Sequence, residues 1–194
     1  MTPVLLERLR EGTREEHRAI EHTLNLLDPG LSTSQYRRWL ERFRGYYGPI
    51  ETRLHGVRDL QALGLELEGR RKLPRLDADL VDLGCRDPAA LASCRRLPAL
   101  DSPADAFGCL YVLEGASLGG RIISRHLESR LGVTPAFGAR FFFGYGEHTA
   151  AMWRRFGTAA VAYAASRDIE DRMIGSAIET FRTFRRWLEA GSTT

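Results

Sequence analysis

Cysteine and lysine are scarce in this sequence of 194 residues, and each scarcity argues against a class of function. The three cysteines, Cys85, Cys94 and Cys109, are odd in number and form no CxxC pair. They predict reduced thiols rather than a disulfide framework or a zinc site. Lys72 is the only lysine, so arginine supplies nearly all of the 28 basic side chains. These arginines alternate with acids along the chain instead of clustering, which argues against a nucleic-acid partner.

Long apolar runs and export signals are also missing from the sequence. No run of about 18 apolar residues occurs, so we expect no membrane span. The first residues, MTPVLLERLREGTREEH, carry charges where a signal peptide has an apolar core, so we expect a cytoplasmic protein. The hydrophobic fraction of 43% and the charged fraction of 27% are typical of a soluble globular protein. Residues 1–194 are therefore expected to form one domain.

Helical periodicity is the pattern that the sequence does contain. Apolar residues recur at spacings of three and four, which indicates amphipathic helices, and no alternating strand pattern runs for more than a few residues. Thr2 and Ser102 stand as N-caps before prolines at the first helical position, and Pro49 is expected to kink or divide the second helix. We predict an all-α, single-domain multi-helix bundle with shorter helices and turns over 58–101 and a loop over 133–146. Its long helices are expected at 2–30, 32–57, 102–132, 147–165 and 168–190.

Two histidines occur close together in the segment TREEHRAIEH of the first predicted helix. His17 follows Thr13 by four residues and precedes Ile20 by three, which places it on the apolar stripe of that helix and predicts an inward side chain. His22 is turned by about 140° from His17 and should point outward. A histidine on an apolar stripe is either a core residue satisfied by one hydrogen bond or a ligand. The sequence of this helix alone leaves both readings open.

Glycines interrupt the helix predicted at 102–132, in the segment EGASLGG. Gly115, Gly119 and Gly120 each cost the helix about 1 kcal/mol relative to alanine. Gly115 and Gly119 lie one turn apart and share a face with Tyr111. This face either packs closely against another helix or lets a flat ligand lie directly on the backbone, and the glycines also permit a kink.

Taken together, the segments LREGTREEHRAIE and YVLEGASLGGRII resemble the haem oxygenase family, and the order of helices fits that family over the whole chain. In the family, the first segment carries the proximal histidine and the second forms a kinked, glycine-rich distal helix. The wording YVLEG is similar to that of bacterial members, including those associated with bacteriophytochromes. The resemblance implies a haem-oxygenase-like bundle that holds haem between the first helix and the distal helix.

The resemblance also implies roles for single residues. His17 would ligate the haem iron, and Glu21 would hydrogen-bond the ring nitrogen that is not on the iron. Gly115 and Gly119 would form the distal wall. The residues expected to hold the haem propionates are Arg10 and Tyr111, with Arg14 and Arg154 as further partners.

One position departs from part of the family. Some members have an aspartate after the first distal glycine, where it organises water, and this sequence has Ala116 there. We therefore expect Ser117, Arg121 or a backbone carbonyl at the kink to anchor that water. Ser117 joins the two glycines as an expected catalytic residue.

The function implied by the resemblance is oxidative cleavage of haem to biliverdin, ferrous iron and carbon monoxide. Haem is then both substrate and cofactor, dioxygen is consumed, and a reductase or ferredoxin supplies electrons. A bacteriophytochrome is an expected recipient of the biliverdin. Two alternatives remain: a haem carrier of the same fold, which would share the ligand residues, and a di-iron oxidase. The second is disfavoured because no histidine has a glutamate three residues before it.

Overall fold

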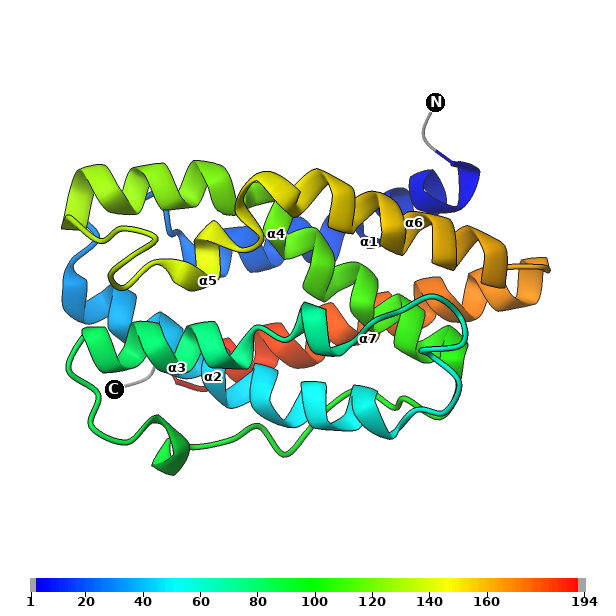
Figure 1. Ribbon diagram of the computed structural model, residues 1–194, viewed down its shortest axis with the longest axis horizontal. Helices are drawn as coiled ribbons and strands as arrows, with labels where there is room; N and C mark the ends of the chain where they lie inside the picture. Colours follow the sequence, from blue (N-terminus) through cyan, green and yellow to red (C-terminus); the bar gives the residue numbers. More distant parts are fainter. Residues whose placement is uncertain (1–2, 192–194) are drawn as a thin grey trace.

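Helices dominate the computed structural model, which describes residues 3–191 (Figure 1). Over these residues the predicted all-α class is confirmed, and the only β-pairing consists of isolated bridges from Thr134. The single-turn helices are η1 (Glu68–Arg70), η2 (Pro88–Ala90) and η3 (Gly146–His148). The α-helices are α1 (Val4–Leu24), α2 (Thr33–Gly56), α3 (Leu73–Asp82), α4 (Pro103–Leu131), α5 (Arg140–Phe143), α6 (Thr149–Tyr163) and α7 (Arg167–Glu189).

Side-chain caps fix where α2 and α4 begin. The Ser102 hydroxyl accepts from the Asp105 backbone N–H at 3.3 Å, which confirms the predicted start of α4. Ser32 starts α2 through a reciprocal capping box with Gln35. The predicted cap at Thr2 lies outside the described residues, and Pro3 is the N-cap of α1 rather than its first helical residue.

Helix α2 continues through Pro49 without a break, so it is not divided as the sequence suggested it could be. Proline lacks the N–H that would bond the carbonyl four residues earlier. That carbonyl, on Gly45, accepts instead from the backbone N–H of Cys94 at 2.8 Å. The buried neighbours Tyr46, Tyr47 and Ile50 hold both halves of α2 in the core. A tertiary hydrogen bond therefore replaces the one that proline removes.

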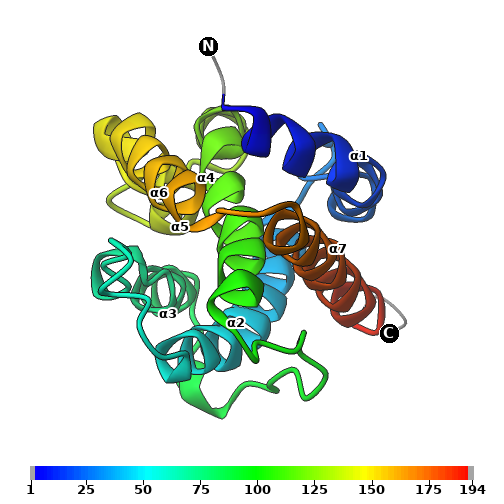
Figure 2. The same cartoon turned by 90° about the vertical axis from the view of Figure 1, so that its right-hand side faces the viewer.

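Helix α4 is the central helix of the bundle, and it bends midway (Figure 1). Its first half crosses α7, where a Cβ at Gly108 would overlap the Met173 carbonyl oxygen. Its second half lies beside α1 and packs against α5 at Gly120, whereas α6 packs on the first half through the rings of Phe107 and Tyr111 (Figures 1 and 2). The bend falls in the glycine-rich segment, and glycine pairs are a common cause of kinks.

The length and composition of α4 are also those of a helix that could cross a membrane. It is the one such helix among the described residues, and 56% of its most apolar window is buried inside the bundle. Core helices of soluble proteins can have the same length and composition, because a strongly apolar helix is buried either in protein or in lipid. Burial in the bundle accounts for this composition.

The short helix α5 was not anticipated, since its segment was expected to be loop. Asp79 is fully buried, and its carboxylate accepts from the backbone N–H groups of Arg140 and Phe141 at 2.9 and 2.8 Å. Phe141 and Phe142 then pack on the ring of Phe43 in α2. A tertiary carboxylate from α3, which no local pattern reveals, therefore anchors the start of this helix.

Candidate functional site

Three of the residues singled out in the sequence, Arg10, His17 and Glu21, flank the buried stripe of α1 on one side, as their spacing along the helix requires. The stripe itself faces α7, and His17 stands beside it with 54% of its side chain exposed. The expectation that His17 points into the core is therefore wrong. Its ring meets the edge of Phe181 from α7, with centroids 5.8 Å apart.

The imidazole of His17 has one carboxylate neighbour, Glu21, one turn further along α1. The distance from His17 Nδ1 to Glu21 Oε2 is 3.5 Å. A carboxylate beside Nδ1 favours the tautomer that carries its proton there, which leaves the Nε2 lone pair available. His22 is exposed on another side of the helix, as predicted. The arrangement matches that of a histidine ligand oriented by a second residue.

The glycines of α4 divide into two kinds when a Cβ is placed on each of them. At Gly120 the added carbon would overlap the backbone carbonyl of Phe142, so this glycine permits close packing with α5. At Gly115 and Gly119 it would meet no atom of residues 3–191 within 4 Å. No protein neighbour therefore requires glycine at these two positions, and the close helix packing considered for this face is excluded for them.

Apolar side chains share the open face of α4 with these two glycines. Leu118 is 48% exposed and Ile122 is 66% exposed, and both lie within about 60° of Gly115 around the helix. Large apolar side chains exposed together usually mark a binding surface. The second half of α4 therefore presents an apolar face with bare backbone at its centre. Figure 2 shows this half of α4 next to α1.

Tyr111 marks the end of this face where α1 and α4 come together. Its phenol interacts with Thr13 and with the charge of Arg10, both on α1, and its ring lies 5.8 Å from that of Trp153 in α6. Burial raises the pKa of Tyr111 above its ordinary value, although Thr13 and Arg10 pull in the opposite direction. The structure thus brings Tyr111 and Arg10 together, as expected of two residues that bind one anionic group.

Other residues singled out in the sequence do not join this face. Ser117 lies about 200° from Gly115 around α4, and its buried hydroxyl lies beside Gly144 without a hydrogen-bond partner in the described part of the chain. Arg154 lines a separate groove that runs between residues 62–66 and α6. Arg14 is exposed and paired with Glu11 at 2.8 Å.

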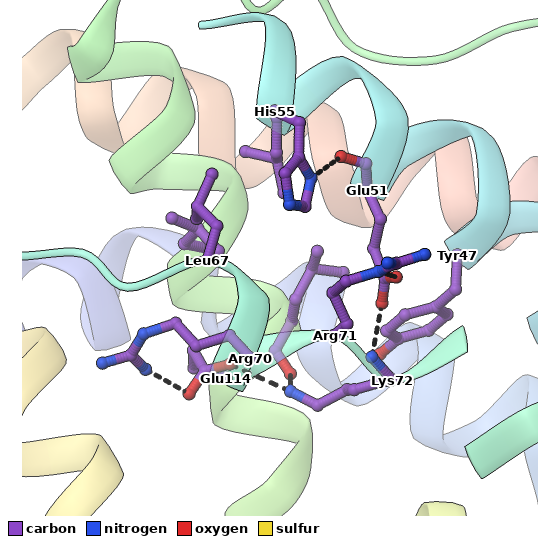
Figure 3. A pocket seen from close by; sticks show the side chains of 11 residues that line it. Tyr47, Glu51, His55, Leu67, Arg70, Arg71, Lys72 and Glu114 are labelled. Carbon is purple, nitrogen blue, oxygen red and sulfur yellow. Dashed lines mark hydrogen bonds and ion pairs between the residues drawn. The ribbon is translucent and has the colours of Figure 1, made fainter. Parts of the chain in front are cut away.

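A buried ionic cluster next to the glycines escaped the sequence analysis (Figure 3). Glu114 has 2% of its side chain exposed and binds Arg70 at 2.6 Å, Lys72 at 3.0 Å and the Tyr145 hydroxyl at 2.8 Å. Two signals were available: an acid inside the apolar segment CLYVLEG, and the only lysine of the chain. Neither signal identifies its partner, because 42 residues separate Lys72 from Glu114.

Comparison with known proteins identifies a family that this chain resembles over most of its length. Residues 4–190 match the model of the protein family described as "Heme oxygenase". A curated relative, a heme oxygenase of Xanthomonas campestris, is 40% identical over 88 residues, which are 45% of this chain. The matched stretch spans 48% of that relative, so it covers about half of its length.

Solved structures of bacterial heme oxygenases share the fold. The NO- and CO-bound enzyme of Neisseria meningitidis superposes with a TM-score of 0.82 at 21% identity, covering 96% of this chain and 91% of that one. The enzyme of Leptospira interrogans superposes with a TM-score of 0.79 at 20% identity, covering 98% and 100% of the two chains. At these identities the likeness establishes the fold.

Proposed function

This chain belongs to the haem oxygenase family, and from that membership we propose that it binds haem between α1 and α4 and cleaves it to biliverdin, ferrous iron and carbon monoxide. The observation that carries the proposal is the open backbone at Gly115 and Gly119. Glycines that no protein neighbour requires, on an exposed apolar face, suit a flat apolar ligand lying directly on the helix. The exposed imidazole of His17 supplies the kind of ligand that haem iron takes.

The proximal side of the proposed site consists of His17 and Glu21. The Nε2 atom of His17 would bind the iron as a neutral imidazole. The Glu21 carboxylate would accept the Nδ1 proton, which holds the tautomer and the ring orientation and raises the basicity of the ligand. The edge of Phe181 restricts rotation of the ring from the other direction.

In this proposal, Arg10 and Tyr111 set the orientation of haem within the plane of its ring. The guanidinium of Arg10 and the phenol of Tyr111 lie near each other at one end of the face, where both could donate to a propionate. Arg14 is a weaker partner because Glu11 already holds its guanidinium. Arg154 would reach a propionate only by leaving the groove that it lines.

On the distal side, the open backbone of α4 at Gly115 and Gly119 would let the flat ring approach closely. When bound, haem supplies the iron that activates dioxygen and the ring that is oxidised. Leu118 and Ile122 would cover the apolar surface of the ring. Because Ser117 lies on the opposite face of α4 and Arg121, one turn later, shares that face, a backbone carbonyl at the bend is the better anchor for the water that delivers protons.

The remaining parts of the proposal concern partners and location. Haem cleavage consumes electrons, so a reductase or a ferredoxin must supply them, and a bacteriophytochrome would use the biliverdin. We place the protein in the cytoplasm, where its free cysteines stay reduced.

Turnover of the haem complex tests this function. The purified chain is loaded with one equivalent of haem and supplied with ascorbate or a ferredoxin system, and the products are separated by chromatography. We expect loss of the haem absorption and the appearance of biliverdin. Stable haem binding without biliverdin would instead identify a haem carrier of the same fold.

A further inference from the structure

The cluster around Glu114 lies at the start of the glycine-rich segment of α4, the helix that bends midway along its length (Figure 1), and Figure 3 shows Arg70 and Lys72 beside its carboxylate. Glu114 immediately precedes Gly115, the first glycine of the open face. Both of its carboxylate oxygens are engaged: Oε1 with Lys72 and Tyr145, and Oε2 with Arg70. The partners come from two segments far apart in the sequence, 70–72 and 145, so one side chain joins α4 to both.

The backbone of α4 is held at the same point. Lys72 Nζ donates to the carbonyl oxygen of Leu113 at 2.8 Å, as well as to Glu114. Arg70 also reaches the carbonyl of Met152 in α6, at 3.5 Å. A helix that bends and carries three glycines within six residues has little stiffness of its own, so contacts from outside must define its course.

Stability alone does not account for such a cluster. Burying a carboxylate with two cations costs desolvation that often cancels their attraction, and apolar residues of similar size would serve a core equally well. A buried ionic cluster does, however, accept only one arrangement, because any displacement leaves a charge unpaired. We therefore expect the cluster to hold α4 in one bent conformation.

We propose that Glu114 is a positioning residue, which fixes the bend of α4 and thereby the place of Gly115 and Gly119 relative to α1. This inference rests on the proposed function, because the position of Gly115 and Gly119 would determine which carbon of the haem ring is attacked. Glu114 does not face the open side of α4, so it acts through the backbone and not by contact with substrate. Its loss should change the product isomers rather than prevent haem binding.

The test compares Glu114→Gln with wild type and with Asp105→Asn. Asp105 is a carboxylate of the same helix that is paired with Arg172, but it lies nine residues before Glu114 and away from the bend. In the protein without haem, amide hydrogen exchange is measured on peptides that cover residues 112–121. We expect exchange there to accelerate by about tenfold or more in Glu114→Gln beyond any change in the peptides of α2 in the same variant, which report global opening, and we expect no such excess in Asp105→Asn.

The second arm measures the biliverdin isomers after turnover. Glu114→Gln should give an altered isomer distribution with haem affinity within a few-fold of wild type, whereas Asp105→Asn should give the wild-type distribution. If Glu114→Gln does not fold, Tyr145→Phe removes a single hydrogen bond from the carboxylate and should shift both readouts in the same direction.

The outcomes separate the two proposals. Wild-type exchange at 112–121 in the folded variant, or accelerated exchange with unchanged isomers, overturns the positioning role while leaving haem oxygenase activity intact. Absence of biliverdin from the wild-type protein overturns the proposed function, and this inference with it.

Discussion

For His17, the sequence predicted the correct helix but the wrong degree of burial. Its spacing from Thr13 and Ile20 put it beside the apolar stripe, but the stripe is narrow enough that a rotation of about 40° moves a residue to the exposed edge. A ligand residue has to be reachable, so exposure suits the proposed role better than burial does. The sequence pattern describes a face and cannot define its margin.

Replacing His17 by alanine should remove the histidine-ligated spectrum of the haem complex. Because the side chain is half exposed, we expect the free energy of unfolding of the haem-free protein to change by less than about 0.5 kcal/mol. His22→Ala is the matched control and should leave the spectrum unchanged. Absorption and electron paramagnetic resonance spectra check both variants, and survival of the ligation in His17→Ala would refute the assignment.

Adjacent glycines of α4 offer a second test at the residue scale. Gly119→Ala should stabilise the haem-free protein by about 0.4–1 kcal/mol, because the helix gains propensity and the new methyl group meets no neighbour. Gly120→Ala should destabilise it by about 1–3 kcal/mol, since the methyl group would overlap the Phe142 carbonyl. Thermal unfolding measures both changes.

Turnover by the haem complex of Gly119→Ala shows whether this glycine serves helix packing or the approach of the ligand. In the haem complex, Gly119→Ala should retain binding but slow biliverdin formation, because the methyl group projects toward the bound ring. A Gly119→Ala variant that is less stable and turns over normally would mean that Gly119 is a packing residue.

At the scale of elements, the start of α4 carries a pH dependence. Burial opposes ionisation of Asp105, but the hydrogen bonds from Arg172 and Ser102 outweigh it and lower the pKa of this carboxyl below its ordinary value. A depressed pKa in the folded state contributes stability above the unfolded pKa, about 3.9, and this stability is lost as the pH falls through the folded value.

Asp105→Asn should therefore lower the free energy of unfolding by about 1–2 kcal/mol at pH 7, and the difference from wild type should shrink below about pH 4. Urea unfolding at a series of pH values measures it. A difference that persists unchanged at pH 2.5 would show that the ionised carboxylate is not the source of the stability.

Elements were predictable wherever their signals are local. The start of α4 at Ser102 and the two C-terminal helices follow from caps and apolar spacing. The continuity of α2 through Pro49, the helix α5 and the Glu114 cluster depend on groups that are remote in the sequence, namely the N–H of Cys94, the carboxylate of Asp79 and the side chain of Lys72. No local pattern contains such partners.

At the scale of the whole molecule, we propose that residues 1–194 unfold as one unit and that haem stabilises this unit by mass action. At a free haem concentration of 100 Kd, binding contributes about 2.7 kcal/mol, which should raise the melting temperature of a chain of this length by about 5–10 °C. Scanning calorimetry of the protein with and without haem measures the shift. His17→Ala should show a smaller rise, and an equal rise in both would place the haem elsewhere.

The proposed function depends most on haem lying between α1 and α4, and a crystal structure of the haem complex tests this directly. We predict iron bound to Nε2 of His17, Glu21 on Nδ1 of the same ring, and the porphyrin plane against the backbone of Gly115 and Gly119. Iron bound to another histidine, or haem in the groove lined by Arg154 and residues 62–66, would contradict it.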